Sequence, residues 1–174
     1  MVEGALYRKE TIVLDSKTSK LTLAGILVAI AVLGGVFSFP VLGSRCAPVQ
    51  HLVNILAAVF LGPLWGVGVA FAASLLRNIA GLGSLMAFPG SMIGALSCGL
   101  VYHYTKRLEL TCIAESLGTG ILGALAAYPV AALLMGLSPA GYTVYIVPFL
   151  PSTGAGSLLA YILLRFLLPK LRQD

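Results

Sequence analysis

Residues 46–76 read CAPVQHLVNILAAVFLGPLWGVGVAFAASLL, a run of 31 residues without a single Asp, Glu, Lys or Arg. A charge at mid-bilayer is costly, so an uncharged run of this length predicts helix buried in a membrane. The run forms either one long tilted helix or two helices broken at Gly62-Pro63. In the second case the first helix, 48–61, is only about 21 Å long.

Three other long uncharged runs predict the remaining helices. Residues 21–44 and 78–105 each suit one helix. Residues 116–164 hold two, divided around 136–141, where Gly and Pro interrupt the apolar pattern. The protein therefore has five or six spans, depending on how residues 46–76 fold.

The distribution of Lys and Arg decides between the two counts, because basic residues concentrate on the cytoplasmic side. Six spans with the N-terminus inside leave nine basic residues inside and two, Arg45 and Arg77, outside, whereas five spans give five inside and six outside. We therefore predict an all-α bundle of six transmembrane helices in a lipid bilayer, with both termini cytoplasmic. The predicted helices are 21–39, 48–61, 64–80, 87–105, 112–136 and 143–168, forming a membrane domain at 21–168 with cytoplasmic tails at 1–20 and 169–174.

Composition supports a membrane protein and excludes several other classes. Of the 174 residues, 59% are hydrophobic and 10% charged, and six spans of about 20 residues leave about 54, too few for a separate catalytic domain. The net charge of +5 comes from basic residues beside apolar runs, so we expect no nucleic-acid partner. The three cysteines lack metal-binding spacing, and hydrolase and phosphate-loop motifs are absent. We expect no enzyme activity, no metal and no cofactor, so energy for transport must come from a partner or a gradient.

Polar residues inside the spans mark the candidate site, because each needs a partner in lipid. Gln50, His51 and Asn54 share one face near the outer end of helix 48–61. Four other segments bring polar or aromatic residues to this depth, and prolines in the last two helices favour a cavity there. With no carboxylate expected at this depth, we predict a pocket for a small, neutral or weakly charged heteroaromatic ligand. The candidate residues are Gln50, His51, Asn54, Arg77, Asn78, Phe88, Ser91, Tyr128, Ser152 and Thr153.

Structural roles remain open for the same residues. His51 and Asn54 could form hydrogen bonds between helices, and Arg77 could extend to the membrane surface. Asn78 could cap a helix, and Tyr128 could pack as an aromatic residue. Ser152 and Thr153 could bond to carbonyl groups of their own helix. Arg45 is interpreted as a loop residue. Glu115 is placed near the cytoplasmic start of helix 112–136, where a negative charge suits the helix dipole and Lys106 or Arg107 can pair with it.

Several short motifs together resemble one family, the ThiW-type S component of energy-coupling factor (ECF) transporters. They are RCAPVQHLVN at 45–54, LGP at 61–63, LRN at 76–78, AFPGSMIGA at 87–95, Glu115 with GTG at 118–120, and AYP at 127–129. The resemblance covers about 21–168 and is densest between Arg45 and Gly99.

The resemblance implies an S-component-like compact bundle in a bacterial plasma membrane that captures the thiamine precursor hydroxyethylthiazole from outside. It implies an ECF transmembrane coupling subunit and two ATPase subunits as partners, which use ATP and make the loaded bundle topple in the membrane. The coupling contact is implied at the small residues Ala24, Gly25, Ala29 and Ala31. Three alternatives remain: an S component for a pyrimidine or for thiamine, a stand-alone small permease or channel, and a structural subunit without a ligand.

Overall fold

The computed structural model describes residues 16–42 and 44–171, which are mostly helical. The elements are α2 (Lys17–Gly34), the 3-10 turn η2 (Gly35–Phe37), β1 (Phe39–Val41), β2 (Ser44–Cys46), α3 (Pro48–Phe60), α4 (Pro63–Ile79), α5 (Ala87–Thr105), α6 (Leu108–Leu117), η3 (Gly118–Gly123), α7 (Ala124–Pro129), η4 (Val130–Leu134) and α8 (Ile146–Leu171). Elements α6 to η4 form one continuous helical run, so the described residues contain the six predicted helices.

Three of these helices are long and apolar enough to cross a membrane, namely Lys17–Phe37, Leu108–Leu134 and Ile146–Leu171. Pro48–Phe60 and Pro63–Ile79 are apolar but shorter. The helical fold is thus confirmed, while six membrane crossings with both termini in the cytoplasm stay a prediction.

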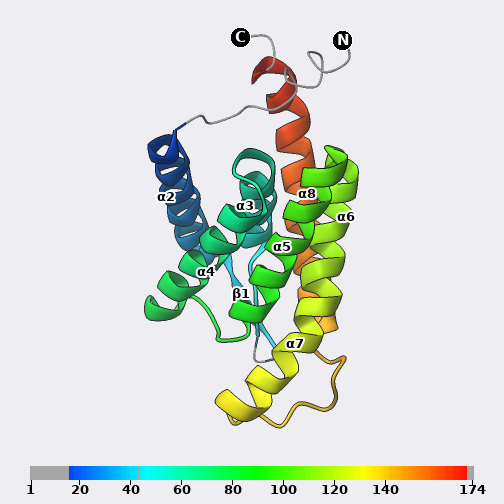
Figure 1. The fold of residues 1–174 in the computed structure, drawn as a ribbon. Coiled ribbons are helices and arrows are strands. Elements are labelled where there is room, and N and C mark those ends of the chain that lie inside the picture. The colour runs from blue at the N-terminus through cyan, green and yellow to red at the C-terminus, as the bar shows by residue number, and fades with distance from the viewer. Residues whose placement is uncertain (1–15, 43, 172–174) are drawn as a thin grey trace.

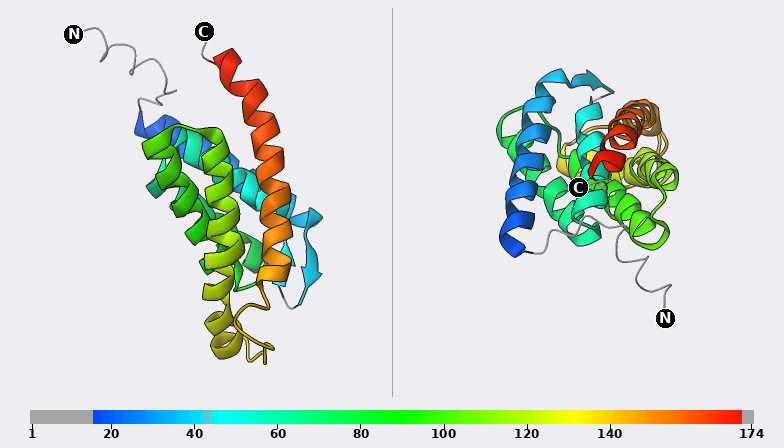
Figure 2. Two further views of the ribbon diagram at one scale, coloured as in Figure 1. Left: turned by 90° about the vertical axis from the view of Figure 1, so that its right-hand side faces the viewer. Right: turned by 90° about the horizontal axis from the view of Figure 1, so that it is seen from above.

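The helices run up and down one bundle (Figure 1). α2 begins and α8 ends at the same end of the bundle, and the connections from α3 to α4 and from α5 to α6 also lie there (Figures 1 and 2). We call this the cationic end, because it carries Lys17, Lys20, Lys106, Arg107, Arg165 and Lys170. The opposite end, which we call the hairpin end, holds β1, β2 and the segments 80–86 and 135–145.

The short helix α3 lies at the centre of the bundle. It contacts α2, α4, α5 and α8, and Gln50, His51 and every residue from Val53 to Val59 are buried. Pro48 occupies its first turn, where a missing N–H costs nothing. At the other end Gly62 adopts a φ of 87° before Pro63 begins α4, a conformation that glycine tolerates best. The helix is only about 20 Å long, and its neighbours cover its sides.

A short β-hairpin, which the sequence did not predict, accompanies the helical bundle. β1 and β2 pair antiparallel, with Phe39 opposite Cys46, Pro40 opposite Arg45 and Val41 opposite Ser44. The hairpin joins α2 to α3 and contacts α8 through β2. Arg45 is therefore held in a strand rather than in an irregular loop.

Several helix boundaries differ from the predicted ones; for example, α2 ends at Gly34 and α8 begins at Ile146. Ser16 caps α2 by accepting a hydrogen bond from the Ser19 amide at 3.0 Å, so helix rather than tail begins at Lys17. The predicted helix 112–136 begins one turn earlier, at Leu108, and contains two π-helical segments, η3 and η4. α8 continues to Leu171, so residues 169–171 of the predicted tail are helix. Residues 1–15 and 172–174 of the two predicted tails lie outside the described residues.

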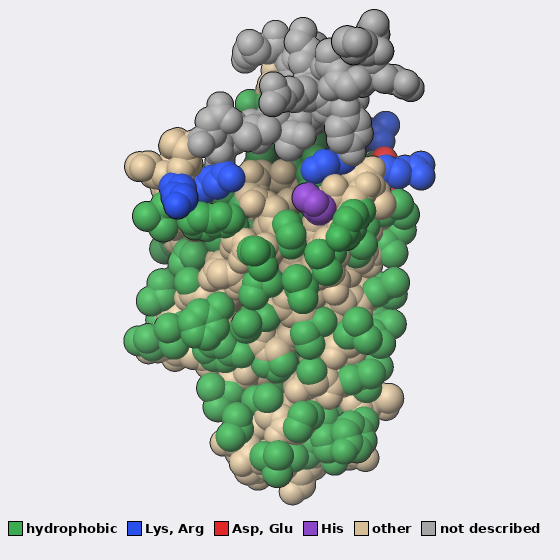
Figure 3. All heavy atoms as spheres, viewed as in Figure 1, with side chains coloured by type: hydrophobic (Ala, Val, Ile, Leu, Met, Phe, Trp, Pro, Cys, Tyr) green, Lys and Arg blue, Asp and Glu red, His purple; other side chains and the backbone are tan. Residues whose placement is uncertain are grey.

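The outer surface of the bundle is largely apolar. Large hydrophobic side chains are exposed on every long helix, for example Ile26 on α2, Ile113 on α6 and Leu158 on α8. On the face drawn in Figure 3, Lys and Arg side chains gather at the cationic end and hydrophobic side chains cover the rest. This pattern suits a bundle surrounded by lipid.

Candidate functional site

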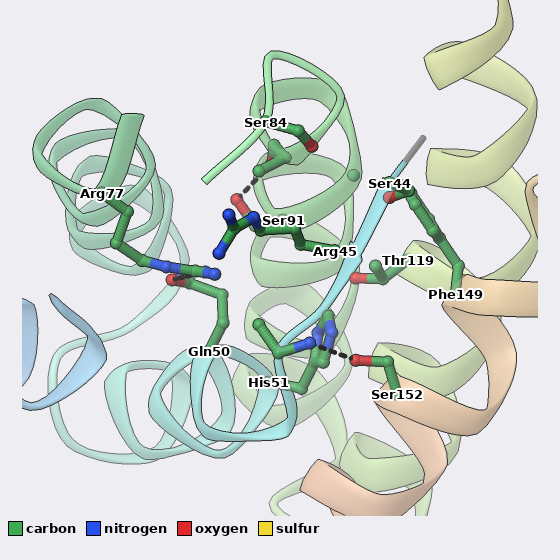
Figure 4. Close-up of a pocket in the computed structure, with 13 residues that line it drawn as sticks. Ser44, Arg45, Gln50, His51, Arg77, Ser84, Ser91, Thr119, Phe149 and Ser152 are labelled. Carbon is green, nitrogen blue, oxygen red and sulfur yellow. Dashed lines mark hydrogen bonds between the residues drawn. The ribbon is translucent and has the colours of Figure 1, made fainter. Parts of the chain in front are cut away.

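A cavity with an empty volume of about 400 Å³ lies inside the bundle toward the hairpin end. Six elements contribute to its wall: β2, α3, α4, α5, η3 and α8. The space open to a water-sized sphere is about 30 Å³, so the cavity is narrow in this structure. The lining residues are Ser44, Arg45, Ala47, Gln50, His51, Arg77, Ser84, Ala87, Gly90, Ser91, Thr119, Phe149 and Ser152 (Figure 4).

Helix α3 supplies the floor of this cavity. Gln50 and His51 line it, and Asn54 lies one turn deeper with an exposed fraction of 0%. Gln50 Nε2 donates to Asn54 Oδ1 at 3.2 Å, which links the two amides along the helix. Asn54 Nδ2 lies within hydrogen-bonding distance of the Ser91 carbonyl oxygen, 3.2 Å, and of Glu115 Oε1, 3.0 Å. The shared face predicted for these three residues is thus present, with Asn54 supporting the wall from behind.

Glu115 is the main correction to the sequence-based prediction. It does not pair with Lys106 or Arg107 near the membrane surface; its side chain is completely buried. Its Oε1 accepts hydrogen bonds from Asn54 Nδ2 and Thr119 Oγ1 and lies 3.0 Å from His51 Nδ1. Oε2 has no hydrogen-bond partner among the described residues. The expectation of a site without a nearby carboxylate was therefore wrong.

The Glu115 carboxylate fixes the role of His51. A carboxylate can only accept, so Nδ1 of His51 carries the hydrogen and donates it. In the neutral ring this leaves Nε2 as an acceptor for a ligand. α8 also packs closely against α3 at this point, because a Cβ at Gly156 would lie 2.7 Å from the His51 Cβ. Gly156 thus allows α8 to hold His51 in place.

Arg77 reaches the cavity from the last turn of α4 and is only 2% exposed. Its Nη1 donates to Gln50 Oε1 at 3.3 Å and its Nη2 donates to the Leu82 carbonyl oxygen at 3.2 Å. Nε has no partner among the described residues. It lies 2.9 Å from the position that a Cβ on Gly35 would occupy. Arg77 is therefore a buried guanidinium held by the 80–86 segment rather than a side chain extending to the membrane surface.

Two serines complete the polar wall. Ser91 Oγ donates to the Ala87 carbonyl oxygen at 2.8 Å and lies 2.9 Å from Ser74 Oγ. Ser152 Oγ accepts a hydrogen bond from the Ala47 amide at 2.8 Å, which ties α8 to the start of α3. The Ser152 hydroxyl hydrogen stays available to a ligand.

Phe149 supplies an apolar part of the wall on α8, the helix that also carries Ser152. Its ring lies against Gly90, where a Cβ would come within 2.9 Å of it. The position was not predicted to bind the ligand; the prediction chose Phe88, which instead packs near Phe71 with ring centroids 5.7 Å apart. The absence of a side chain at Gly90 is what admits the Phe149 ring.

Half of the predicted site residues lie on the cavity wall: Gln50, His51, Arg77, Ser91 and Ser152. The others have partners elsewhere. Asn78 donates to the carbonyl oxygens of Ser74 and Ser84. Tyr128 stacks on Tyr142, with the two ring centroids 3.9 Å apart. Thr153 is buried and donates to the Leu150 carbonyl oxygen. These contacts match the structural roles that the sequence left open: a helix-end contact for Asn78, aromatic packing for Tyr128 and a bond to its own helix for Thr153.

Sequence reasoning missed three lining residues that define the chemistry: Arg45, Thr119 and Phe149. Arg45 is the first residue of the motif at 45–54 that carried the family resemblance, which was a usable signal. Thr119 lies in the π-helical segment η3, where the side-chain direction departs from the α-helical pattern. Nothing in the sequence distinguished Phe149 from other aromatic residues near the hairpin end.

The residues predicted to contact a coupling subunit divide between two faces of α2. Gly25 and Ala29 are exposed, whereas Ala24 and Ala31 are 8% and 1% exposed and belong to the hydrophobic core. Ala24 and Ala31 therefore cannot form part of an outer contact in this structure. Gly25 and Ala29 remain available for one.

The comparisons with known proteins identify the fold and the family of this chain. The fold matches a solved chain described as "Structure and mechanism of the S component of a bacterial ECF transporter", with a TM-score of 0.67 and 20% identity, over 91% of this chain and 98% of that chain. None of the curated proteins matches this chain. The family described as "Thiamine-precursor transporter protein (ThiW)" matches residues 21–170. Because that match spans most of the sequence, the protein belongs to the ThiW family, and its fold is that of an S component.

Proposed function

We propose that this protein is the substrate-binding subunit of an ECF-type uptake transporter and that its cargo is the thiamine precursor hydroxyethylthiazole. The observation that carries the proposal is the polar cavity of the ThiW-family chain, walled by Gln50, His51, Ser91, Ser152 and Phe149 inside an otherwise apolar bundle. Such a cavity, mostly closed and with a few aimed polar groups, is typical of small-molecule sites.

The groups left unpaired in the cavity suit a hydroxyethyl-substituted heteroaromatic ring. His51 Nε2 accepts from the ligand hydroxyl, and the Ser152 hydroxyl donates to a ring or side-chain acceptor. Phe149 packs against the ring. Asn54 acts through Gln50 and His51, because its own hydrogen bonds are already made within the protein.

In this proposal the protein works with a transmembrane coupling subunit and two ATPase subunits in a bacterial plasma membrane. The cationic end faces the cytoplasm, with both termini, and the hairpin end faces outward. The bundle crosses the membrane six times and topples when the ATPases act, which carries the loaded cavity inward. Gly25 and Ala29 on the exposed face of α2 contact the coupling subunit.

Thermal unfolding of the purified protein in an uncharged detergent tests the cargo. The panel contains hydroxyethylthiazole, the aminopyrimidine precursor, thiamine and riboflavin. A ligand at 100 times its dissociation constant adds about 2.7 kcal/mol of stability when it binds only the folded state. Stabilisation by the thiazole alone supports the proposal, stabilisation by another compound changes the cargo, and no stabilisation by any compound argues against a substrate-binding role.

A substitution in α3 tests whether the ligand binds in the cavity. His51→Ala removes both the ligand acceptor and a partner of Glu115, so we expect a loss of binding of about 1–3 kcal/mol. His103→Ala is the matched control, because His103 is exposed at the cationic end. If His51→Ala binds the thiazole as tightly as His103→Ala does, the thiazole binds elsewhere.

Reconstitution separates an ATP-driven transporter from a stand-alone permease. Liposomes containing the protein with its coupling subunit and ATPases should accumulate the cargo only when ATP is supplied. Uptake by the protein alone, without ATP, would favour the permease or channel.

A further inference from the structure

The cavity contains two guanidinium groups and no carboxylate among its lining residues. Arg77 is 98% buried, yet its observed hydrogen bonds use only two of the five N–H donors of a guanidinium. Both of its partners are neutral carbonyl oxygens, one from Gln50 and one from Leu82. A buried cation with neutral partners and unused donors is an expensive arrangement unless an anion completes it.

Arg45 faces the same space from the hairpin. It is half-buried, and its Nη1 makes one long hydrogen bond to Ser38 Oγ at 3.4 Å. Figure 4 shows the guanidinium groups of Arg45 and Arg77 pointing toward one another above Gln50, and the two like charges repel each other. An anion placed between them would turn this repulsion into two attractions.

Glu115 does not supply that anion. Its Oε1 already accepts from His51, Asn54 and Thr119. Glu115 itself lies behind the wall, beyond His51 and Thr119, and is not among the lining residues. The hydrogen-bonding groups of the cavity that remain unpaired are therefore mainly donors, namely N–H groups of the two arginines and the Ser152 hydroxyl.

We infer that the Arg45–Arg77 end of the cavity is a subsite for an oxyanion carried by the ligand, either a phosphate monoester or a carboxylate. Guanidinium groups bind both through paired N–H donors in a fixed fork. Two positive charges match the charge of about −2 on a phosphate monoester. The inference deepens the proposed function and rests on it, because it names the charged form of the same heteroaromatic cargo.

Equilibrium binding to the full chain in an uncharged detergent tests the subsite. The three ligands are hydroxyethylthiazole, its phosphate monoester, and the analogue in which the hydroxyethyl arm is oxidised to a carboxylate. The variants are Arg45→Gln and Arg77→Gln, with Arg165→Gln as the matched control, because Arg165 is exposed near the cationic end. Arg45→Gln decides the test if Arg77→Gln does not fold, since Arg45 is half-buried and makes only one long hydrogen bond.

The wild-type protein should bind at least one anionic form about tenfold more tightly than the alcohol, or better. Arg45→Gln should remove most of this preference while Arg165→Gln keeps it. Which anion gains affinity identifies the oxyanion. The subsite is refuted if the alcohol binds as tightly as both anions, or if the preference survives in Arg45→Gln and in any folded Arg77→Gln; both results leave the proposed function intact. If none of the three ligands binds the wild type, the proposed function fails together with the subsite.

Discussion

Replacing Glu115 with Ala tests the buried network at its centre. The carboxylate is 0% exposed, and its Oε1 lies 3.0 Å from each of three polar atoms: His51 Nδ1, Asn54 Nδ2 and Thr119 Oγ1. Two of these come from α3, so the variant loses contacts between separate helices as well as one within its own helical run. All three donor residues stay buried when the acceptor is removed.

The size of the effect follows from these three contacts. Hydrogen bonds between membrane helices average about 0.6 kcal/mol, so three of them give a lower bound of about 2 kcal/mol. A buried donor without an acceptor costs about 1–3 kcal/mol, so stranding His51 and Asn54 raises the loss to as much as about 6 kcal/mol. At about 2–4 °C per kcal/mol for a chain of this length, the unfolding midpoint should fall by at least about 4 °C.

The assay is thermal unfolding in one detergent, with three variants measured beside the wild type. Glu115→Gln keeps an acceptor oxygen, so its unfolding midpoint should lie between those of the wild type and Glu115→Ala. Glu109→Ala is the matched control, because Glu109 is an exposed carboxylate in the first turn of the same helix. The reasoning is refuted if Glu115→Ala unfolds within a degree of Glu109→Ala, since a surface carboxylate paired with Lys106 or Arg107 would behave in that way.

Three further outcomes follow from the packing. Gly94→Ala should lose about 1–3 kcal/mol of stability in thermal unfolding, because its Cβ would collide with Thr119 Oγ1 and the Glu115 carboxylate, whereas Gly25→Ala, where a Cβ meets nothing within 4 Å, should lose none. Tyr128→Ala should leave thiazole affinity unchanged in a binding titration, because that ring stacks outside the cavity. Gly25→Leu should reduce ATP-driven uptake in liposomes while ligand affinity stays the same.

The sequence predicted the helices well because lipid imposes a simple rule. A charged residue inside the bilayer is costly, so uncharged runs mark the helices, although not all of their ends. Pro48 marks the beginning of α3 at the position predicted, and Pro63 marks the beginning of α4 one residue before the predicted start. The same rule cannot detect the hairpin 39–46, because a two-stranded turn leaves no comparable pattern of charge.

The site was harder to predict, because it depends on how each helix is rotated. On α3 the regular spacing of Gln50, His51 and Asn54 was enough to place them on one face. In the run 108–134, each π-helical turn holds one residue more than an α-helical turn and rotates the following side chains by about 100°. Tyr128 therefore points to Tyr142 rather than to the cavity.

Glu115 was misplaced for a related reason. The predicted helix began near residue 112, which put this carboxylate at the membrane surface. The observed helix begins at Leu108, so Glu115 lies two turns inside it, about 10 Å along the helix axis from Leu108 and about 6 Å further in than predicted. Sequence rules treat a charge near a helix end as exposed, whereas here Gly94 leaves the space that a buried carboxylate needs.

Under the proposed function, the buried carboxylate should couple folding to ligand binding. Glu115 uses its acceptor capacity on groups that surround the cavity, so the cavity itself keeps mostly donors. In the proposed function, a ligand rich in acceptors would complete contacts with α3, α4 and α8. Removing Glu115 should weaken stability and affinity together, because it releases His51, whereas removing Arg45 should weaken affinity alone. The two variants therefore separate the part of the site that holds the bundle together from the part reserved for the ligand.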